Sequence, residues 1–271
     1  MAQCLEEPST RPTIRSIARY RGIDLAFWYV NKKMLRLRSH IFTHTVLNAS
    51  HCTLPAVPSG LSALHTLKAL VLSHNDIADL GSSFPHLPEL NTLVLSHNQL
   101  RSLPATLPTS LPRLKKLSLG HNRLTCDGLP DFSVCSHLRE VRLSGNTSIH
   151  HLPTHVSQWG RGVDGGAPGL VLLDVSECGI DHWDDMRSLC KEDSTANTER
   201  HGLVNLCAKG NGISSPEDAY HERLREWIPS LRILDNVRLD VPKTATSPAL
   251  EVLPPKKVSE TSSAPPSSTP S

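Results

Sequence analysis

The sequence has little of what marks a membrane-spanning or secreted protein. Its 271 residues contain no run of about 18 apolar residues, so we expect no transmembrane helix. Residues 1–10 are polar and include Glu6 and Glu7, unlike the basic and apolar regions of a signal peptide. The chain is 38% hydrophobic and 20% charged with a net charge of +2, a balance that supports one domain with a continuous core.

Motifs for metal, phosphate or catalysis are also scarce. None of the seven cysteines forms a Cys-x-x-Cys pair, so Cys126, Cys135 and His137 do not predict a zinc site. Residues 160–165 fit Gly-x-Gly-x-x-Gly, but a following glycine and proline exclude the helix that a phosphate site needs, and we expect an insertion loop. The His-x-x-x-His pair at 151–155 lacks the glutamate of a zinc protease. We therefore predict no catalytic residue, no metal site and no cofactor.

What the chain does contain is a repeat, Leu-x-x-Leu-x-Leu-x-x-Asn-x-Leu. The most complete copies begin at Leu67, Leu90 and Leu114, and a fourth begins at Leu138. Seven copies follow one another at steps of 23, 23, 24, 24, 32 and 33 residues. Their ninth position holds Cys52, Asn75, Asn98, Asn122, Asn146, Cys178 and Asn211.

The repeat has a local physical reason. Leu-x-Leu alternation points side chains to opposite faces of a short strand, so that one face enters a core. The amide of the ninth-position asparagine can bond to backbone groups that a sharp turn leaves unpaired, and cysteine replaces it less fully. One unit cannot bury its own apolar face, but stacked neighbours can. The pattern therefore predicts a parallel β-solenoid.

This pattern resembles the leucine-rich-repeat superfamily over residues 44–240. The resemblance implies an α/β fold, in which a curved parallel β-sheet forms the concave face and 3₁₀, helical or extended segments form the convex side. The short repeats return through segments rich in proline, such as 84–88, which favours extended or 3₁₀ backbone over a long helix. In a longer repeat, Trp183, Met186 and Leu189 predict a helical return near residues 182–191.

Both ends of the repeat domain are predicted to carry helical caps. After a flexible start at 1–10, the basic and aromatic segment 11–43 is expected to form the first cap. At the far end, residues 215–218 combine proline with acidic residues, which is typical of a helix start. A stripe at helical spacing follows, made of Tyr220, Leu224 and Trp227.

The C-terminal cap carries a further family resemblance. Residues 231–236 are similar to the Leu-x-x-Leu-Asp cap of intracellular leucine-rich-repeat proteins. Secreted members usually carry clustered, disulfide-bonded cysteines instead, whereas the cysteines of this chain are scattered. We therefore expect an intracellular protein, cytoplasmic or nuclear. The remaining residues, 241–271, are rich in Pro, Ser and Thr and are predicted to be disordered.

Strand alternation also predicts which side chains line the concave face. The first row reads Val46, Ala69, Thr92, Lys116, Glu140, Leu172 and Asn205. The second row reads Asn48, Val71, Val94, Ser118, Arg142, Asp174 and Cys207. One end of the face is thus small and apolar, its centre is basic, and acidic residues follow. We predict a partner-binding surface formed by Val71, Val94, Lys116, Ser118, Arg139, Arg142 and Asp174.

A histidine precedes the turn residue in four consecutive repeats, as His51, His74, His97 and His121. Because adjacent strands lie about 5 Å apart, these rings are expected to stack in a column. Such a column can bind a metal or sense pH, since close imidazoles resist simultaneous protonation. Ser-His-Asn is also a common filler in this family, and we favour that structural interpretation, with an accessory binding role as the alternative.

The resemblance predicts a non-enzymatic protein–protein interaction scaffold that binds its partner through the concave face. We expect a monomer that joins a hetero-complex away from membranes. One alternative is a ribonucleoprotein or RNA-processing component, similar to the leucine-rich-repeat subunit of a spliceosomal particle, with an indirect RNA association. Eight Lys and Arg between Arg11 and Arg38 support that alternative. A third is a regulatory subunit of a phosphatase or kinase.

Overall fold

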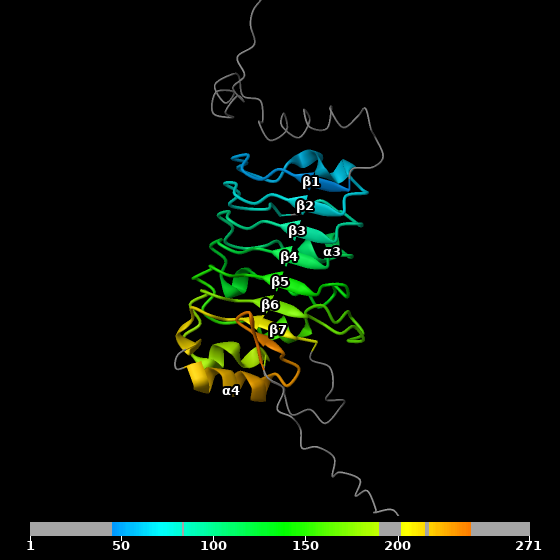
Figure 1. The fold of residues 1–271 in the computed structure, drawn as a ribbon. Coiled ribbons are helices and arrows are strands. Elements are labelled where there is room, and N and C mark those ends of the chain that lie inside the picture. Colours follow the sequence, from blue (N-terminus) through cyan, green and yellow to red (C-terminus); the bar gives the residue numbers. More distant parts are fainter. Residues whose placement is uncertain (1–44, 83, 190–201, 215–216, 240–271) are drawn as a thin grey trace, which may run out of the picture. The chain divides into compact units, whose positions relative to one another are not determined.

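A computed structural model describes residues 45–82, 84–189, 202–214 and 217–239 of the protein (Figure 1). The expected flexible start at 1–10, the cap at 11–43 and the tail at 241–271 lie outside these residues. Among the helices that are described, none has the length and apolar character needed to cross a membrane.

In the part of the chain that the structure describes, nine short strands form one sheet, in which each strand pairs with the next along the chain. The first eight run parallel, as the repeat predicted, and the last turns back antiparallel. The strands are β1 Val46–Asn48, β2 Ala69–Val71, β3 Thr92–Val94, β4 Lys116–Ser118, β5 Glu140–Arg142, β6 Leu172–Asp174, β7 Asn205–Cys207, β8 Ile233–Leu234 and β9 Val237–Arg238. The predicted α/β solenoid with an open parallel sheet is therefore confirmed, and the sequence pattern missed only the final hairpin.

The segments that return from one strand to the next are short and mostly 3₁₀. They include η2 Ser59–Ala63, η3 Cys126–Gly128, η4 Thr154–Gln158, η5 Trp183–Leu189 and η6 Gly212–Ser214, with one α-helical turn, α3 Leu107–Ser110. Prolines favour this geometry, because they interrupt the hydrogen bonds of a longer α-helix. The helical return predicted near 182–191 is present as η5, which buries Met186 and Leu189 against the core.

The repeated leucines form a single core along the stack. The middle residue of each strand points inward, and Leu70, Leu93 and Leu117 are completely or almost completely buried. The ninth-position asparagines are buried beside them. Asn122 donates to the carbonyls of Leu95 and Leu119 at 3.0 and 2.7 Å. Its Oδ1 also accepts the N–H of Leu100 at 3.1 Å.

Cysteine at the ninth position bonds to fewer backbone groups of the turn than asparagine does, as the sequence suggested. The Sγ of Cys178 makes two contacts of 3.4 and 3.5 Å with backbone carbonyls. A thiol is a weak donor with a single hydrogen, whereas an amide offers two donors and an acceptor. The turns at Cys52 and Cys178 instead receive help from the next repeat, whose asparagines Asn75 and Asn211 accept their N–H groups at 3.0 and 2.9 Å.

The C-terminal end of the stack is covered by α4, Glu217–Trp227, and by the β8–β9 hairpin (Figure 1). Tyr220 and Leu224 are buried, as the helical stripe predicted, and Trp227 packs partly buried against the core. The Trp227 ring meets the Trp183 ring of η5 edge to face, with centroids 5.4 Å apart. The guanidinium of Arg223 lies 4.8 Å from the Trp183 ring centroid. Aromatic contacts therefore attach the cap to the last long repeat.

Candidate interaction surface

The strand register brings the two predicted outward rows together on one face of the sheet. The first residues of β1 to β7 pair with one another in sequence, as do the third residues. The middle residues between them are buried. We call these two rows the strand face. It consists of Val46, Ala69, Thr92, Lys116, Glu140, Leu172 and Asn205 in one row, and Asn48, Val71, Val94, Ser118, Arg142, Asp174 and Cys207 in the other.

One end of the strand face is apolar. Val71 and Val94 are register partners on neighbouring strands, and both are half-buried. Val46, on β1, is 58% exposed. These valines leave apolar surface open to solvent on a framework whose inward residues already fill the core.

The centre of the strand face is charged, but it is not simply basic. The carboxylate of Glu140 lies between two cations, 3.0 Å from the Lys116 Nζ and 2.6 Å from an Arg142 guanidinium nitrogen. The side chains of Lys116 and Arg142 remain 61% and 50% exposed, whereas that of Glu140 is 18% exposed. The three residues form a network with a net charge of +1. Sequence reasoning assigned Glu140 to the first row but did not anticipate that it would bridge the two cations.

Arg139, which the sequence placed among the binding residues, lies outside the two rows and makes contacts within the fold. Its guanidinium donates to four backbone carbonyls, those of Ser136, Leu138, Gly160 and Gly169. Burial lowers the pKa of Arg139. The Arg139 side chain therefore holds the segment after η4 against the preceding repeat, and Arg139 is not part of the strand face.

The predicted insertion loop is confirmed, because Gly160, Gly162 and Gly165 all have positive φ and no helix lies between them and β6.

Ser118 and Asp174 lie on the strand face as predicted, and both are held by neighbouring serines. The Oγ atoms of Ser118 and Ser96 are 2.8 Å apart. Asp174 Oδ1 accepts from the N–H and the hydroxyl of Ser176 at 3.1 and 2.8 Å. These bonds fix the orientation of both side chains before any partner arrives.

The histidine column is present and borders the strand face at the turns. Neighbouring rings of His51, His74, His97 and His121 are stacked, with centroids 4.3, 4.1 and 4.3 Å apart. All four residues have φ between 54° and 56°, in the left-handed region. Burial lowers the pKa of His97, and the neighbouring imidazoles of His121, His74 and His51 lower it further.

The column ends at a glycine for a steric reason. Gly145 takes the histidine's place in the next repeat, with φ at 73°. A Cβ at this position would lie 2.5 Å from Nδ1 of His121. The His121 ring thus lies against the turn of the following repeat, and Gly145 leaves room for it.

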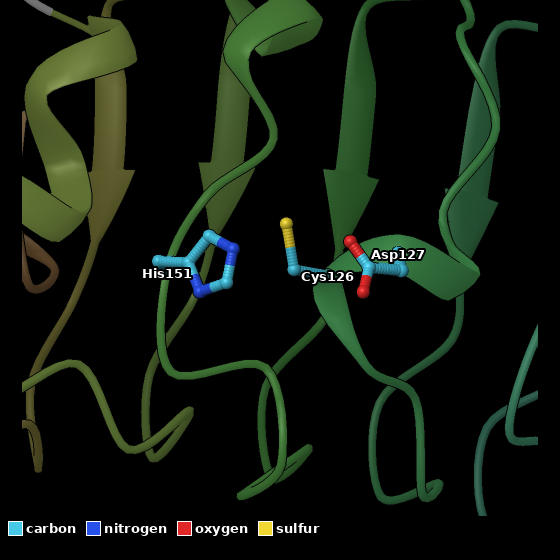
Figure 2. A group of neighbouring side chains, drawn as sticks. All are labelled: Cys126, Asp127 and His151. Atoms are coloured by element: carbon cyan, nitrogen blue, oxygen red, sulfur yellow. The ribbon is translucent and has the colours of Figure 1, made fainter.

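A second group of ligand-type side chains was missed in the sequence. Cys126, Asp127 and His151 each offer one donor atom, and these three atoms all lie within 4.8 Å of one another. Figure 2 shows the Cys126 sulfur between the imidazole and the carboxylate. Cys135, which the sequence set beside Cys126, is instead completely buried, and burial, with the nearby charge of Asp131, raises the pKa of its thiol to about 12. The signal for this group was the repeat period, since Asp127 and His151 are one 24-residue step apart.

Comparison with known families agrees with this architecture. A model described as "Leucine rich repeat" matches residues 88–147, and a second of the same description matches residues 63–82. This is a leucine-rich-repeat protein. Proteins with such repeats are typically binding modules for other proteins. No curated protein matches the chain.

Several solved leucine-rich-repeat structures are similar to this one. An internalin from Listeria monocytogenes is 20% identical with a TM-score of 0.48, over 84% of this chain and 60% of the internalin chain. The leucine-rich-repeat domain of a Shigella effector is 18% identical with a TM-score of 0.45, over 82% of this chain and 94% of that domain. A leucine-rich-repeat protein from Leptospira interrogans is 24% identical with a TM-score of 0.43, over 70% and 48% of the two chains. Similarity at this level does not extend to partners or activities.

Proposed function

We propose that this leucine-rich-repeat protein is a non-enzymatic scaffold that holds a partner protein on its strand face. The observation that supports the proposal is the junction of two surfaces on one rigid sheet. Val71 and Val94 leave apolar area exposed beside the charged network of Lys116, Glu140 and Arg142. Apolar anchors beside a polar rim resemble the anatomy of a protein interface.

The strand face also suits binding energetically. The backbone of β2 to β7 is fixed by parallel pairing on both sides, so a partner orders few groups when it docks. The exposed cations Lys116 and Arg142 carry the net positive charge of the network, which favours a partner segment with an apolar anchor and an acidic flank. The ribonucleoprotein alternative rests on the basic segment 11–38, which lies outside the described residues.

The state of the cysteines supports the compartment proposed from the sequence. Five described cysteines are free thiols, four of them are buried, and Cys52, Cys135 and Cys178 belong to the repeat core. Free core thiols fit the reducing interior of a cell better than an oxidising exterior. We propose an intracellular protein that joins its partner as a single copy.

The first test of the strand face is the substitution Val94→Glu. A charge placed at an anchor position should weaken partner binding by more than about 1–2 kcal/mol. Affinity purification from cells followed by mass spectrometry, comparing this variant with the wild type, measures the loss. Thermal unfolding should change little, because Val94 is on the outer row of β3.

Two further variants separate binding from folding. Leu95→Ala removes a completely buried side chain and should cost about 2–5 kcal/mol of stability. Val134→Glu places the same new charge on a valine that is 42% exposed outside the strand face, and it should leave the partners in place. If Val94→Glu retains every partner that the wild type retains, the strand face is not the binding surface.

A further inference from the structure

The repeat geometry brings Cys126, Asp127 and His151 together. Asp127 and His151 are 24 residues apart, which is the step from Asn122 to Asn146. They therefore occupy equivalent positions in consecutive repeats, and such positions are about 5 Å apart in a parallel stack. Cys126 precedes Asp127 in η3 and is buried, while Asp127 and His151 are exposed.

Backbone hydrogen bonds fix η3 where it presents Cys126 and Asp127. The N–H of Gly128 donates to Thr125 at 3.1 Å, and the carbonyl of Gly128 accepts from Leu103 of the preceding repeat at 2.8 Å. A Cβ at Gly128 would lie 2.5 Å from the carbonyl oxygen of Arg101, so this turn packs directly on its neighbour. The two side chains therefore start from a rigid base.

The backbone around His151 is held as well. The N–H of His151 donates to the carbonyl of Ile149 at 2.6 Å, and the N–H of Leu152 donates to the backbone carbonyl of Asp185 at 2.8 Å. The imidazole then extends from this segment toward the thiol of Cys126 (Figure 2).

The three donor atoms are close to the spacing that a metal needs. Zinc bonds of about 2.0–2.3 Å in tetrahedral geometry place ligand atoms roughly 3.5 Å apart. The donors of this group lie within 4.8 Å of one another, and the side chains of Asp127 and His151 are exposed. The buried thiol supplies one fixed ligand, and the exposed side leaves a fourth position for water or a partner group.

We propose that Cys126, Asp127 and His151 form a three-ligand site for a single zinc ion that links two consecutive repeats. The chemistry of the donors selects the metal. A thiolate and an imidazole suit zinc, whereas magnesium and calcium take oxygen ligands. Thiolate and carboxylate together balance the two positive charges of the ion.

Cobalt(II) is the probe for this site, because it replaces zinc and absorbs light when a thiolate binds it. The full chain, reduced and treated with a chelator, is titrated with cobalt(II). We expect one equivalent to bind with a thiolate-to-cobalt charge-transfer band, and added zinc(II) to remove the band. Cys126→Ser should abolish the band. His151→Ala should weaken binding by more than the roughly 10–100-fold that loss of an outer-shell partner costs.

Matched controls distinguish this site from the other thiols and from the histidine column. Cys207→Ser removes a half-buried thiol on β7, and His97→Asn interrupts the column, so both should keep the charge-transfer band. Circular dichroism verifies the fold of each variant. If Cys126→Ser fails to fold, the binding of cobalt(II) by His151→Ala tests the proposal instead, because this variant alters only an exposed side chain. The proposal is overturned if cobalt(II) gives no thiolate band, if the band survives Cys126→Ser, or if His97→Asn removes it.

Discussion

Each buried asparagine of the repeat serves two consecutive repeats at once. The Nδ2 of Asn98 donates to the carbonyls of Leu72 and Leu95 at 3.0 and 2.9 Å. Its Oδ1 accepts the N–H of Ile77 at 3.1 Å. We expect Asn98→Ala to lower the free energy of unfolding by about 2–4 kcal/mol, because an unsatisfied buried backbone group costs about 1–3 kcal/mol.

Denaturant unfolding monitored by circular dichroism measures this loss. Asn91→Ala is the matched control, because Asn91 is half-buried and its side-chain oxygen accepts from the Thr92 hydroxyl. It should cost less than about 1 kcal/mol. Equal losses in the two variants would show that the ladder of turn asparagines is not what stabilises the stack.

The histidine column makes stability depend on pH at the level of one side chain. The pKa of His97 is lowered below its ordinary 6.5 by burial and then by His121, His74 and His51. The unfolded chain therefore takes up a proton at a pH where the folded chain does not. This part of the stability is fully present above the unfolded value, and it declines as pH falls through 6.5 toward the lower folded value.

His97→Asn should remove part of this dependence, and asparagine tolerates the left-handed backbone of the position. Denaturant unfolding at about pH 7.5 and at about pH 5.5, on either side of the ordinary histidine pKa, measures the stability difference in each protein. The wild type should lose more stability on acidification than the variant. A larger loss of stability in the variant would mean that folding raises the pKa of His97 instead of lowering it.

At the scale of the element, one carboxylate joins both parts of the C-terminal cap to the segment that follows β7. Asp235, in the β8–β9 turn, accepts from the N–H groups of Ala208 and Lys209 at 2.7 and 2.9 Å. It also accepts from the hydroxyl of Tyr220 in α4 at 2.8 Å. Burial and this bond to a carboxylate raise the pKa of Tyr220, so its hydroxyl stays protonated and keeps donating.

We expect Asp235→Ala to lower the free energy of unfolding by about 2–4 kcal/mol, since a hydrogen bond to a charged group contributes about 1.5–3 kcal/mol. Denaturant unfolding of Asp235→Ala, Tyr220→Phe and the double variant should reveal coupling of about 0.5–3 kcal/mol. Asp184→Ala, at an exposed acidic residue of η5, should change stability by less than about 0.5 kcal/mol. Strictly additive losses for Asp235 and Tyr220 would mean that the cap does not depend on their bond.

At the scale of the whole molecule, the sequence predicts the features that recur with the period of the repeat. The strands follow from the Leu-x-Leu alternation, so the two rows of the strand face, including Val94 and Arg142, were placed correctly. The period does not determine how return segments cross between repeats. That is why the carbonyl contacts of Arg139 required the structure.

Because each repeat contacts only its neighbours, the ends of the stack decide how much of the core meets water. A chain that ends at Ser214 loses α4 and the hairpin, which bury Tyr220, Leu224, Ile228 and Leu234. A chain that ends at Leu239 keeps them and lacks Asp240 and the segment predicted to be disordered.

Thermal unfolding of these two truncated chains tests the cap as a whole. Each buried side chain of this size contributes about 1.5–3 kcal/mol, and 1 kcal/mol shifts the Tm of a domain this large by roughly 2–4 °C. The chain ending at Ser214 should therefore melt more than about 10 °C lower than the full protein or fail to remain in solution, since β7 then becomes an open edge. The chain ending at Leu239 should melt within about 2 °C of the full protein. Equal melting of the two would show that the repeats hold their core closed without the cap.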